Sequence, residues 1–339
     1  MDKLDLCQKL PPEVIVLILS NLSFPDLYAF SSVCLQALSI FKIVPSIISS
    51  RKVYNLKLIP GTYVRVTGLD KLSTGEILII DHTSHTISLV NNCCTSSKTL
   101  INNSVTSYND GPFEYTRVLF PVCCVIDSDD NAIFSDRSHH TIRKLDMKES
   151  ITSTIVGKPY LRGPLEDGCL NLPSGICKAD NGNILICDEY NAAIRILTPE
   201  GHLKNVVELK GRQFVQKTPS MRPPYPRRIA YNSQTGDMYF VVRSNIVHFK
   251  NGKETLVHQH TDKIFGLVVD DKSGDVFFGS EAKAESSTSG LFRIYTKMDG
   301  YPVVSVKLND SCITQITGLG YSNGTLLIGS HSKACMVEL

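Results

Sequence analysis

The sequence predicts a mainly β protein, in which a short N-terminal all-α segment is followed by a six-bladed β-propeller. From Gly61 onward one pattern returns six times: a short apolar strand, a Gly, Asn or Asp turn, and a second apolar strand. In the three plainest copies the second strand ends at Asp81, Asp136 and Asp188, so that successive copies are 55 and 52 residues apart. This period and strand content are typical of four-stranded propeller blades.

The all-α segment is predicted from the spacing of apolar residues near the N-terminus. Pro11 suits the first turn of a helix, and a second helix is expected to open at Pro25, where the carboxylate of Asp26 lies close to free N–H groups. A few short helices are too small to bury a core of their own. We therefore expect part of their apolar surface to bind a partner. The apolar residues on one face of the first helix are Val14, Leu17, Ile18 and Leu22.

Residues 10–34 resemble an F-box in their order and spacing, through Leu10-Pro11, Glu13-Val14, Ile18-Leu19-Ser20, Leu22, Asp26-Leu27 and Val33-Cys34. The resemblance implies that the segment docks on the Skp-type adaptor of an SCF (cullin) ubiquitin ligase. It assigns adaptor contact to Leu10, Pro11, Glu13, Ile18, Leu19, Leu22, Asp26, Leu27 and Val33. The alternative is a small helical cap that packs on its own protein.

One position departs from the F-box pattern. The family usually has a tryptophan about three residues after the Val-Cys pair, and here that position is Ala37, in a chain without tryptophan. Loss of a large anchor can remove a sizeable share of an interface's energy, and Leu35, Leu38 and Phe41 are the neighbours that can compensate. The expected domains are an F-box helical domain at residues 1–48 and a propeller at residues 49–339.

The third copy of the repeat resembles an NHL repeat. Its features are Pro173-Ser174-Gly175-Ile176, a strand that ends at Asp188, then Asn191 and Ile194-Arg195-Ile196. His85 and His140 occupy the position of the family's histidine in the first two copies, whereas the third copy has Ala192. We expect the strand-end aspartates to brace the blades by accepting N–H groups of the following loop, because short polar side chains bond well to nearby backbone.

Closing the ring requires one more strand than the C-terminal copy contains. After the last apolar strand only residues 335–339 remain, which supply a third strand and no fourth. Residues 52–59 resemble the outer strand of the third copy, Leu203-Lys204-Asn205-Val206-Val207-Glu208-Leu209. We therefore predict that they complete the sixth blade and cover an edge that would otherwise invite aggregation.

Composition narrows the possible roles. The chain has 339 residues, 42% of them hydrophobic, and a formal net charge of +2, which argues against a globally basic nucleic-acid protein. Its eleven cysteines are an odd number without a C-x-x-C pair, so they are expected to be core thiols in a reducing cytoplasm or nucleus. We expect no secretory signal, membrane span, metal site, cofactor or catalytic residue.

The two-part layout predicts a non-catalytic substrate receptor of an SCF ligase, whose partners are a Skp-type adaptor, cullin and a target protein. One alternative is an RNA-binding NHL propeller, since some members use a basic face. The other is a metal-dependent enzyme, since some six-bladed propellers carry a lyase or lactonase centre in the axial channel. His258 and His260 are the one pair that suggests such a centre, and we expect them in an exposed loop.

A basic segment between the third and fourth copies is the candidate for target recognition. From Lys210 to Arg228 there is no Asp or Glu, and four prolines are expected to stiffen the chain. Arginine suits carboxylate and phosphate, so an acidic or phosphorylated target is expected. The alternative is a solvated basic loop. The residues assigned to target binding are Lys210, Arg212, Arg222, Arg227 and Arg228.

Overall fold

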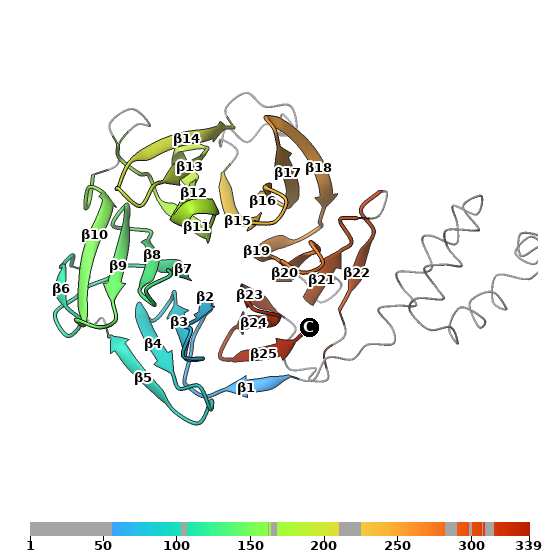
Figure 1. The fold of residues 1–339 in the computed structure, drawn as a ribbon. Coiled ribbons are helices and arrows are strands. Elements are labelled where there is room, and N and C mark those ends of the chain that lie inside the picture. Colours follow the sequence, from blue (N-terminus) through green and yellow to red (C-terminus); the bar gives the residue numbers. More distant parts are fainter. Residues whose placement is uncertain are drawn as a thin grey trace, which may run out of the picture.

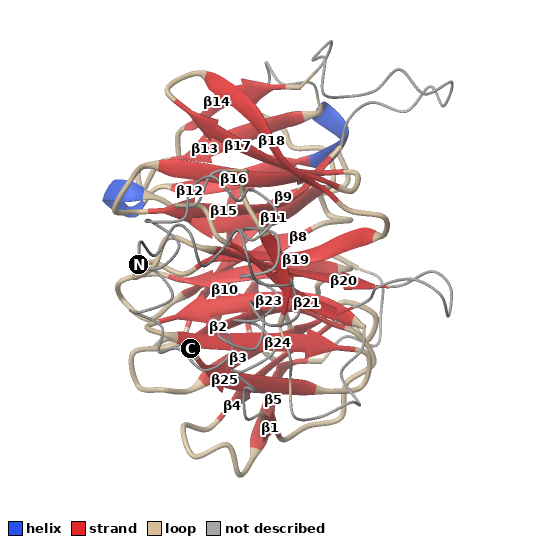
Figure 2. Cartoon of the chain, turned by 90° about the vertical axis from the view of Figure 1, so that its right-hand side faces the viewer, coloured by secondary structure: helices blue, strands red, loops and turns tan. Residues whose placement is uncertain are grey.

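The structure, a computed structural model, describes residues 56–102, 107–161, 163, 168–209, 225–281, 290–297, 300–306, 308 and 315–339. Their strands form six sheets arranged as a ring around one axis (Figure 1). In the side view, two short 3-10 helices, η2 (Asp180–Gly182) and η3 (Glu189–Asn191), lie on opposite faces of this disc (Figure 2). The predicted mainly β class and six blades are confirmed. The predicted helices of residues 10–34 lie outside the described residues.

Each blade is an antiparallel sheet whose strands follow one another outward from the axis. The first blade consists of β2 (Val66–Lys71), β3 (Ile77–Asp81), β4 (Thr86–Val90) and β5 (Ser97–Ile101). The third consists of β11 (Pro173–Lys178), β12 (Ile184–Asp188), β13 (Ala193–Leu197) and β14 (Leu203–Glu208). The fourth consists of β15 (Pro226–Asn232), β16 (Asp237–Val242), β17 (Asn245–Lys250) and β18 (Lys253–Gln259). The fifth consists of β19 (Lys263–Val269), β20 (Val276–Glu281), β21 (Gly290–Ile294) and β22 (Val303–Ser305).

The second blade has a fifth strand that the sequence pattern does not predict. Its regular strands are β7 (Pro121–Ile126), β8 (Ala132–Asp136), β9 (Thr141–Asp146) and β10 (Ile151–Gly157). The extra strand β6 (Gly111–Pro112) pairs with the outer edge of β10. Arg143 of β9, which is fully buried, ties this segment down, because its guanidinium contacts Asp110 at 2.7 Å and Asp136 at 2.9 Å. A buried cation with two carboxylates and backbone carbonyl acceptors is a well-compensated charge.

The sixth blade joins the two ends of the described chain. It consists of β23 (Ile316–Ser322), β24 (Thr325–Ser330), β25 (Ala334–Glu338) and, as its outer strand, β1 (Lys57–Ile59). β1 pairs antiparallel with β25, with Lys57 opposite Met336 and Ile59 opposite Ala334. The predicted closure of the ring by the segment before the first repeat is therefore confirmed for residues 57–59, and residues 52–55 lie outside the described residues.

The apolar core lies between neighbouring blades. Leu78 and Ile80 of the first blade, for example, pack in one cluster with Phe134 of the second. Toward the axis the inner strands approach so closely that a side chain would not fit at some positions. A Cβ atom added to Gly320 of β23 would lie 2.1 Å from the carbonyl oxygen of Leu69 in β2. Glycine is therefore required where the inner strands converge.

The strand-end aspartates brace each of the first three blades to the segment that leads into its own inner strand. Asp136 accepts a hydrogen bond from the N–H of Leu119 at 3.0 Å, and Asp188 accepts one from the N–H of Asn171 at 2.7 Å. The prediction that the following loop supplies backbone N–H groups is wrong for these two blades, because their loops contribute side-chain donors instead. It is right for Asp81, which accepts N–H groups from both segments.

The repeat histidines link one blade to the next. The Nδ1 atoms of His85 and His140 accept hydrogen bonds from the N–H groups of Phe120 and Leu172, each at 3.0 Å. Both histidines have a positive φ, as does Ala192 at the corresponding place in the third blade. The three positions are thus structurally equivalent, and in the first two the histidine ring joins neighbouring blades.

Within the described residues, no helix is long and apolar enough to cross a membrane.

Candidate functional site: the axial channel

A channel along the axis of the ring contains two cavities. The inner strands all run from one face of the disc, here called the upper face, to the other, the lower face. The upper cavity, about 270 Å³, is lined by residues where inner strands begin, such as Thr67 and Ser174. The lower cavity, about 300 Å³, is lined by residues where they end, such as Lys178 and Tyr321. Arg228 lines both cavities, so it lies where they meet.

The upper cavity is rich in cationic side chains. They come from the first, second, fourth and fifth blades, and are Arg65, Arg137, Arg227, Arg228 and Lys263. His82 also lines it, and burial together with the nearby cations lowers the pKa of its imidazole to about 4, so this ring is neutral at pH 7. The upper cavity is therefore suited to an anion.

Carboxylates compensate only part of this positive charge. Glu189 is buried, and its Oε2 atom accepts hydrogen bonds from Nε and Nη2 of Arg137 at 3.2 and 3.1 Å. Its Oε1 atom lies 3.2 Å from Nη2 of Arg227. Glu281 forms an ion pair with Arg65 at 2.9 Å. Two carboxylates thus form ion pairs with three of the five cations. Among the described residues no ion pair is found for the other two, Arg228 and Lys263.

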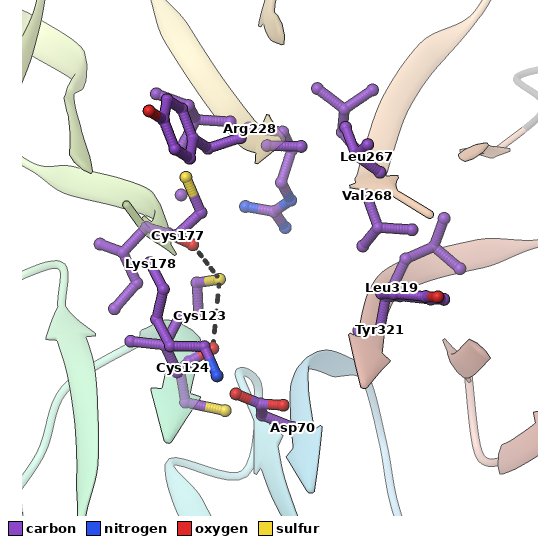
Figure 3. Close-up of a pocket in the computed structure, with 18 of the residues that line it drawn as sticks. Asp70, Cys123, Cys124, Cys177, Lys178, Arg228, Leu267, Val268, Leu319 and Tyr321 are labelled. Atoms are coloured by element: carbon purple, nitrogen blue, oxygen red, sulfur yellow. Dashed lines mark hydrogen bonds between the residues drawn. The ribbon is translucent and has the colours of Figure 1, made fainter. Parts of the chain in front are cut away.

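The lower cavity is more apolar and contains thiols (Figure 3). Cys123 and Cys177 project from neighbouring inner strands, and the Cys123 thiol donates to the carbonyl oxygen of Ile176 at 3.4 Å. Burial raises the pKa of both thiols, so they are protonated and poorly nucleophilic at neutral pH. Asp70 lines the same cavity, and burial raises the pKa of its carboxyl group as well.

The residues predicted to bind a target fall into two groups. Lys210, Arg212 and Arg222, like all the predicted adaptor-binding residues, lie outside the described residues, and their roles stay predictions. Arg227 and Arg228 belong to β15, so the prediction that they lie in a connecting loop is wrong. Arg227 is partly exposed and paired with Glu189, whereas Arg228 is buried in the channel. The structure brings both of them to the upper cavity.

Sequence reasoning missed the other members of the upper cavity, although a signal for them exists. His82, Arg137 and Glu189 each directly follow a strand-end aspartate in successive blades. Equivalent positions of a propeller repeat must converge on the same part of the ring. Aligning the copies by their aspartates would therefore have predicted a charged cluster at one mouth of the channel.

The histidine pair that suggested a metal-dependent enzyme lies away from the axis. His258 belongs to β18, the outer strand of the fourth blade, and His260 follows it. Both rings are partly buried against Phe278 of the fifth blade, so the expectation of an exposed loop is wrong. Their closest ring nitrogens are 3.4 Å apart. Among the described residues, no three His, Cys, Asp or Glu side chains are placed so that they could hold a metal ion.

Burial of His258 predicts that the fold is sensitive to acid. Burial lowers the pKa of this imidazole from 6.5 to about 4, so between these values the unfolded chain binds a proton that the folded chain does not. The contribution is therefore fully favourable above about pH 6.5 and declines as the pH falls toward 4. We expect His258→Gln to reduce the drop in urea midpoint between pH 7.5 and pH 5. His202→Gln, at an exposed position, is the control, and equal drops in both variants would contradict the prediction.

Comparison with known proteins identifies the N-terminal segment. Residues 7–49 match the family model described as the F-box domain. The chain carries an F-box followed by a six-bladed β-propeller. A search of curated proteins found no match to this chain.

Solved structures that resemble the chain are propellers. Virginiamycin B lyase from Staphylococcus aureus superimposes with a TM-score of 0.55 at 14% identity, over 84% of this chain and 98% of that one. A gluconolactonase from Xanthomonas campestris gives 0.59 at 12% identity, over 84% and 89%. The calcium-binding protein regucalcin from Agrobacterium tumefaciens gives 0.57 at 10% identity, over 85% and 95%. At such identities the similarity shows the fold alone.

Proposed function

We propose that this F-box protein is the substrate receptor of an SCF (cullin-RING) ubiquitin ligase. In this proposal the F-box binds a Skp-type adaptor, and the propeller, which we assign to the NHL type, binds the target protein. The observation that carries it is an F-box domain placed directly before a closed ring with a cavity at each end of its axis. Such a receptor needs no catalytic centre, because ubiquitin transfer belongs to other subunits. We place it in the cytoplasm or nucleus.

The position of β1 supports the proposal that the F-box binds the adaptor and the propeller binds the target. β25 runs from the upper to the lower face, so β1, which is antiparallel to it, begins at the lower face with Leu56 just before it. Only residues 50–56 separate this strand from the end of the F-box match at residue 49. The F-box and the propeller are therefore adjacent in sequence, and the described chain enters the ring at its lower face. We propose that the target binds at the opposite, upper mouth of the channel.

The charges of the upper cavity weigh against the metal-dependent alternative. A divalent cation would meet the five cationic side chains of this cavity, and Glu189, its one carboxylate among the described residues, is already held by two guanidinium groups. Metal retained by the purified chain would favour the enzymatic alternative. RNA binding, the other alternative, predicts an affinity that falls steeply with salt.

The proposal is tested by parallel pull-downs of the intact chain and of a chain that begins at Ser49, from cells in which proteasomal degradation is blocked. The intact chain is expected to recover the adaptor, cullin and target proteins, whereas the shortened chain is expected to recover the targets alone. Loss of adaptor and cullin with the F-box is the decisive difference. Recovery of neither ligase subunit by the intact chain would overturn the proposed function.

A further inference from the structure

Arg228 is a buried cation that lacks a carboxylate partner. The residue is 8% exposed, and burial lowers the pKa of its guanidinium group, which nevertheless stays charged. Nε donates to the carbonyl oxygen of Phe265, and Nη1 donates to that of Arg227 at 3.3 Å. No ion pair joins it to a carboxylate within the described part of the chain. Glu189 is near enough to act on its charge but forms its ion pairs with Arg137 and Arg227. A buried charge is strongly unfavourable unless an opposite charge compensates it.

The guanidinium group faces space that a ligand can occupy. Arg228 lines both the upper cavity, about 270 Å³, and the lower cavity, about 300 Å³. In the close-up its side chain projects from β15 into the channel, across from Val268 and Leu319 (Figure 3). Its donors are thus accessible from within the channel, and their planar fork matches the two oxygens of a carboxylate or phosphate.

The surrounding charges favour the same kind of ligand. Five of the residues that line the upper cavity are cationic and one, Glu189, is a carboxylate, while His82 is neutral at pH 7. Glu281, which pairs with Arg65, does not line the cavity. A cleft lined by one sign of charge concentrates counter-charged ligands. The exposed Lys263 stands at this mouth, whereas the exposed Lys178 stands at the lower one.

An aromatic and apolar rim adjoins this mouth on the first three blades. Three of the ten large apolar side chains that are exposed among the described residues adjoin residues that line the upper cavity: Val64 precedes Arg65, Tyr190 follows Glu189, and the ring of Phe120 lies 5.1 Å from that of His82. Tyr190 also stacks on Tyr225, with ring centroids 4.5 Å apart. Arginine together with exposed aromatic residues is the composition of protein-binding hot spots. The rim therefore fits a polypeptide better than a small free anion.

We propose that the upper mouth binds an oxyanion, carboxylate or phosphate, carried by a segment of the target protein that lies across the aromatic rim. The anionic group compensates Arg228 at the floor of the upper cavity, and Lys263 stabilises it from the rim. Apolar residues beside it pack on Phe120 and Tyr190. This inference rests on the proposed receptor function, and it names the chemistry of the target.

The test measures binding of the full-length chain, purified with its adaptor, to arrays of peptides with randomised flanks and a central threonine, phosphothreonine or glutamate. Phosphothreonine or glutamate peptides are expected to bind about tenfold more tightly than threonine peptides, because hydrogen bonds between charged groups are stronger than those between neutral groups. Lys263→Gln is expected to weaken this binding several-fold. Lys178→Gln, the same change at the lower mouth, is expected to leave it unchanged.

Arg228→Gln separates a binding role from a structural one. The amide can still donate to the carbonyl oxygen of Phe265, and the unpartnered charge is gone. The melting temperature is therefore expected to stay the same or rise, while the preference for anionic peptides is lost. A lower melting temperature with an unchanged peptide preference would show that Arg228 only supports the fold, and would overturn the proposal.

Inorganic phosphate, added at constant ionic strength, distinguishes the source of the anion. Stabilisation by phosphate without any preference among the peptides would assign the mouth to a free small anion and overturn the peptide part of the proposal. Equal binding of all three peptide classes without phosphate stabilisation would overturn it entirely. Adaptor content is measured in the same samples, so that loss of the adaptor would count against the proposed function and not against the anion site.

Discussion

A chain that begins at Gly61, and therefore lacks β1, is expected to lose most of its stability and to aggregate. Ile59 of β1 is buried, and Leu56 packs against the core cluster of the sixth blade. Burial of such side chains contributes about 1.5–3 kcal/mol each, and every ladder hydrogen bond adds about 1 kcal/mol. The sum is on the order of 5 kcal/mol, which is comparable with the whole stability of many proteins. Loss of β1 also exposes the edge of β25 for pairing with other chains.

The measurement is thermal melting with light scattering, and a chain that begins at Ser49 is the matched control, because it lacks the same N-terminal region but keeps β1. The control is expected to be soluble and to melt cooperatively. Equal melting temperatures for the two chains would show that the ring does not depend on β1.

Replacement of both Leu10 and Pro11 by alanine is expected to abolish co-purification of the Skp-type adaptor. Both residues lie within the F-box match, and truncation of a hot-spot residue costs roughly 2 kcal/mol or more, or about thirtyfold in affinity. Two such losses would raise a micromolar dissociation constant beyond the range of a pull-down. The propeller is expected to melt as in the unmodified chain, because its blades do not include these residues.

Leu256→Ala is the control for this second prediction, because it removes an exposed leucine of β18 from the propeller instead. It is expected to leave adaptor recovery unchanged. If purified adaptor fails to bind the unmodified chain at micromolar concentration, Ala37 in place of the family's usual tryptophan is decisive and the SCF proposal fails.

The fold was predictable from the sequence because its main signals repeat. Six copies of one strand pattern establish the blade count, and the similarity of residues 52–59 to the outer strand of another blade reveals the closure. β6 could not be predicted, since two residues carry no periodicity and their place depends on Arg143, about thirty residues later.

The candidate site was predictable only in part. Arg227 and Arg228 stand out because they belong to a run without acidic residues. Arg65, Arg137 and Lys263 are single cations far apart in the chain, and only the closed ring brings them to one mouth. The difference between a loop arginine and a buried channel arginine depends on packing that a charge pattern does not encode.

The seam between β1 and β25 links the integrity of the receptor to the completion of its synthesis. Ile59 leaves the ribosome 275 residues before its partner Ala334. β1, the first strand of the ring to be made, can therefore pair only after β25, the last strand, has been made. A chain whose translation stops early would carry an F-box joined to an open ring with two unpaired edges. The unpaired edges of such a product would favour pairing with other chains, so the ring is protected from aggregation only once β25 has been made.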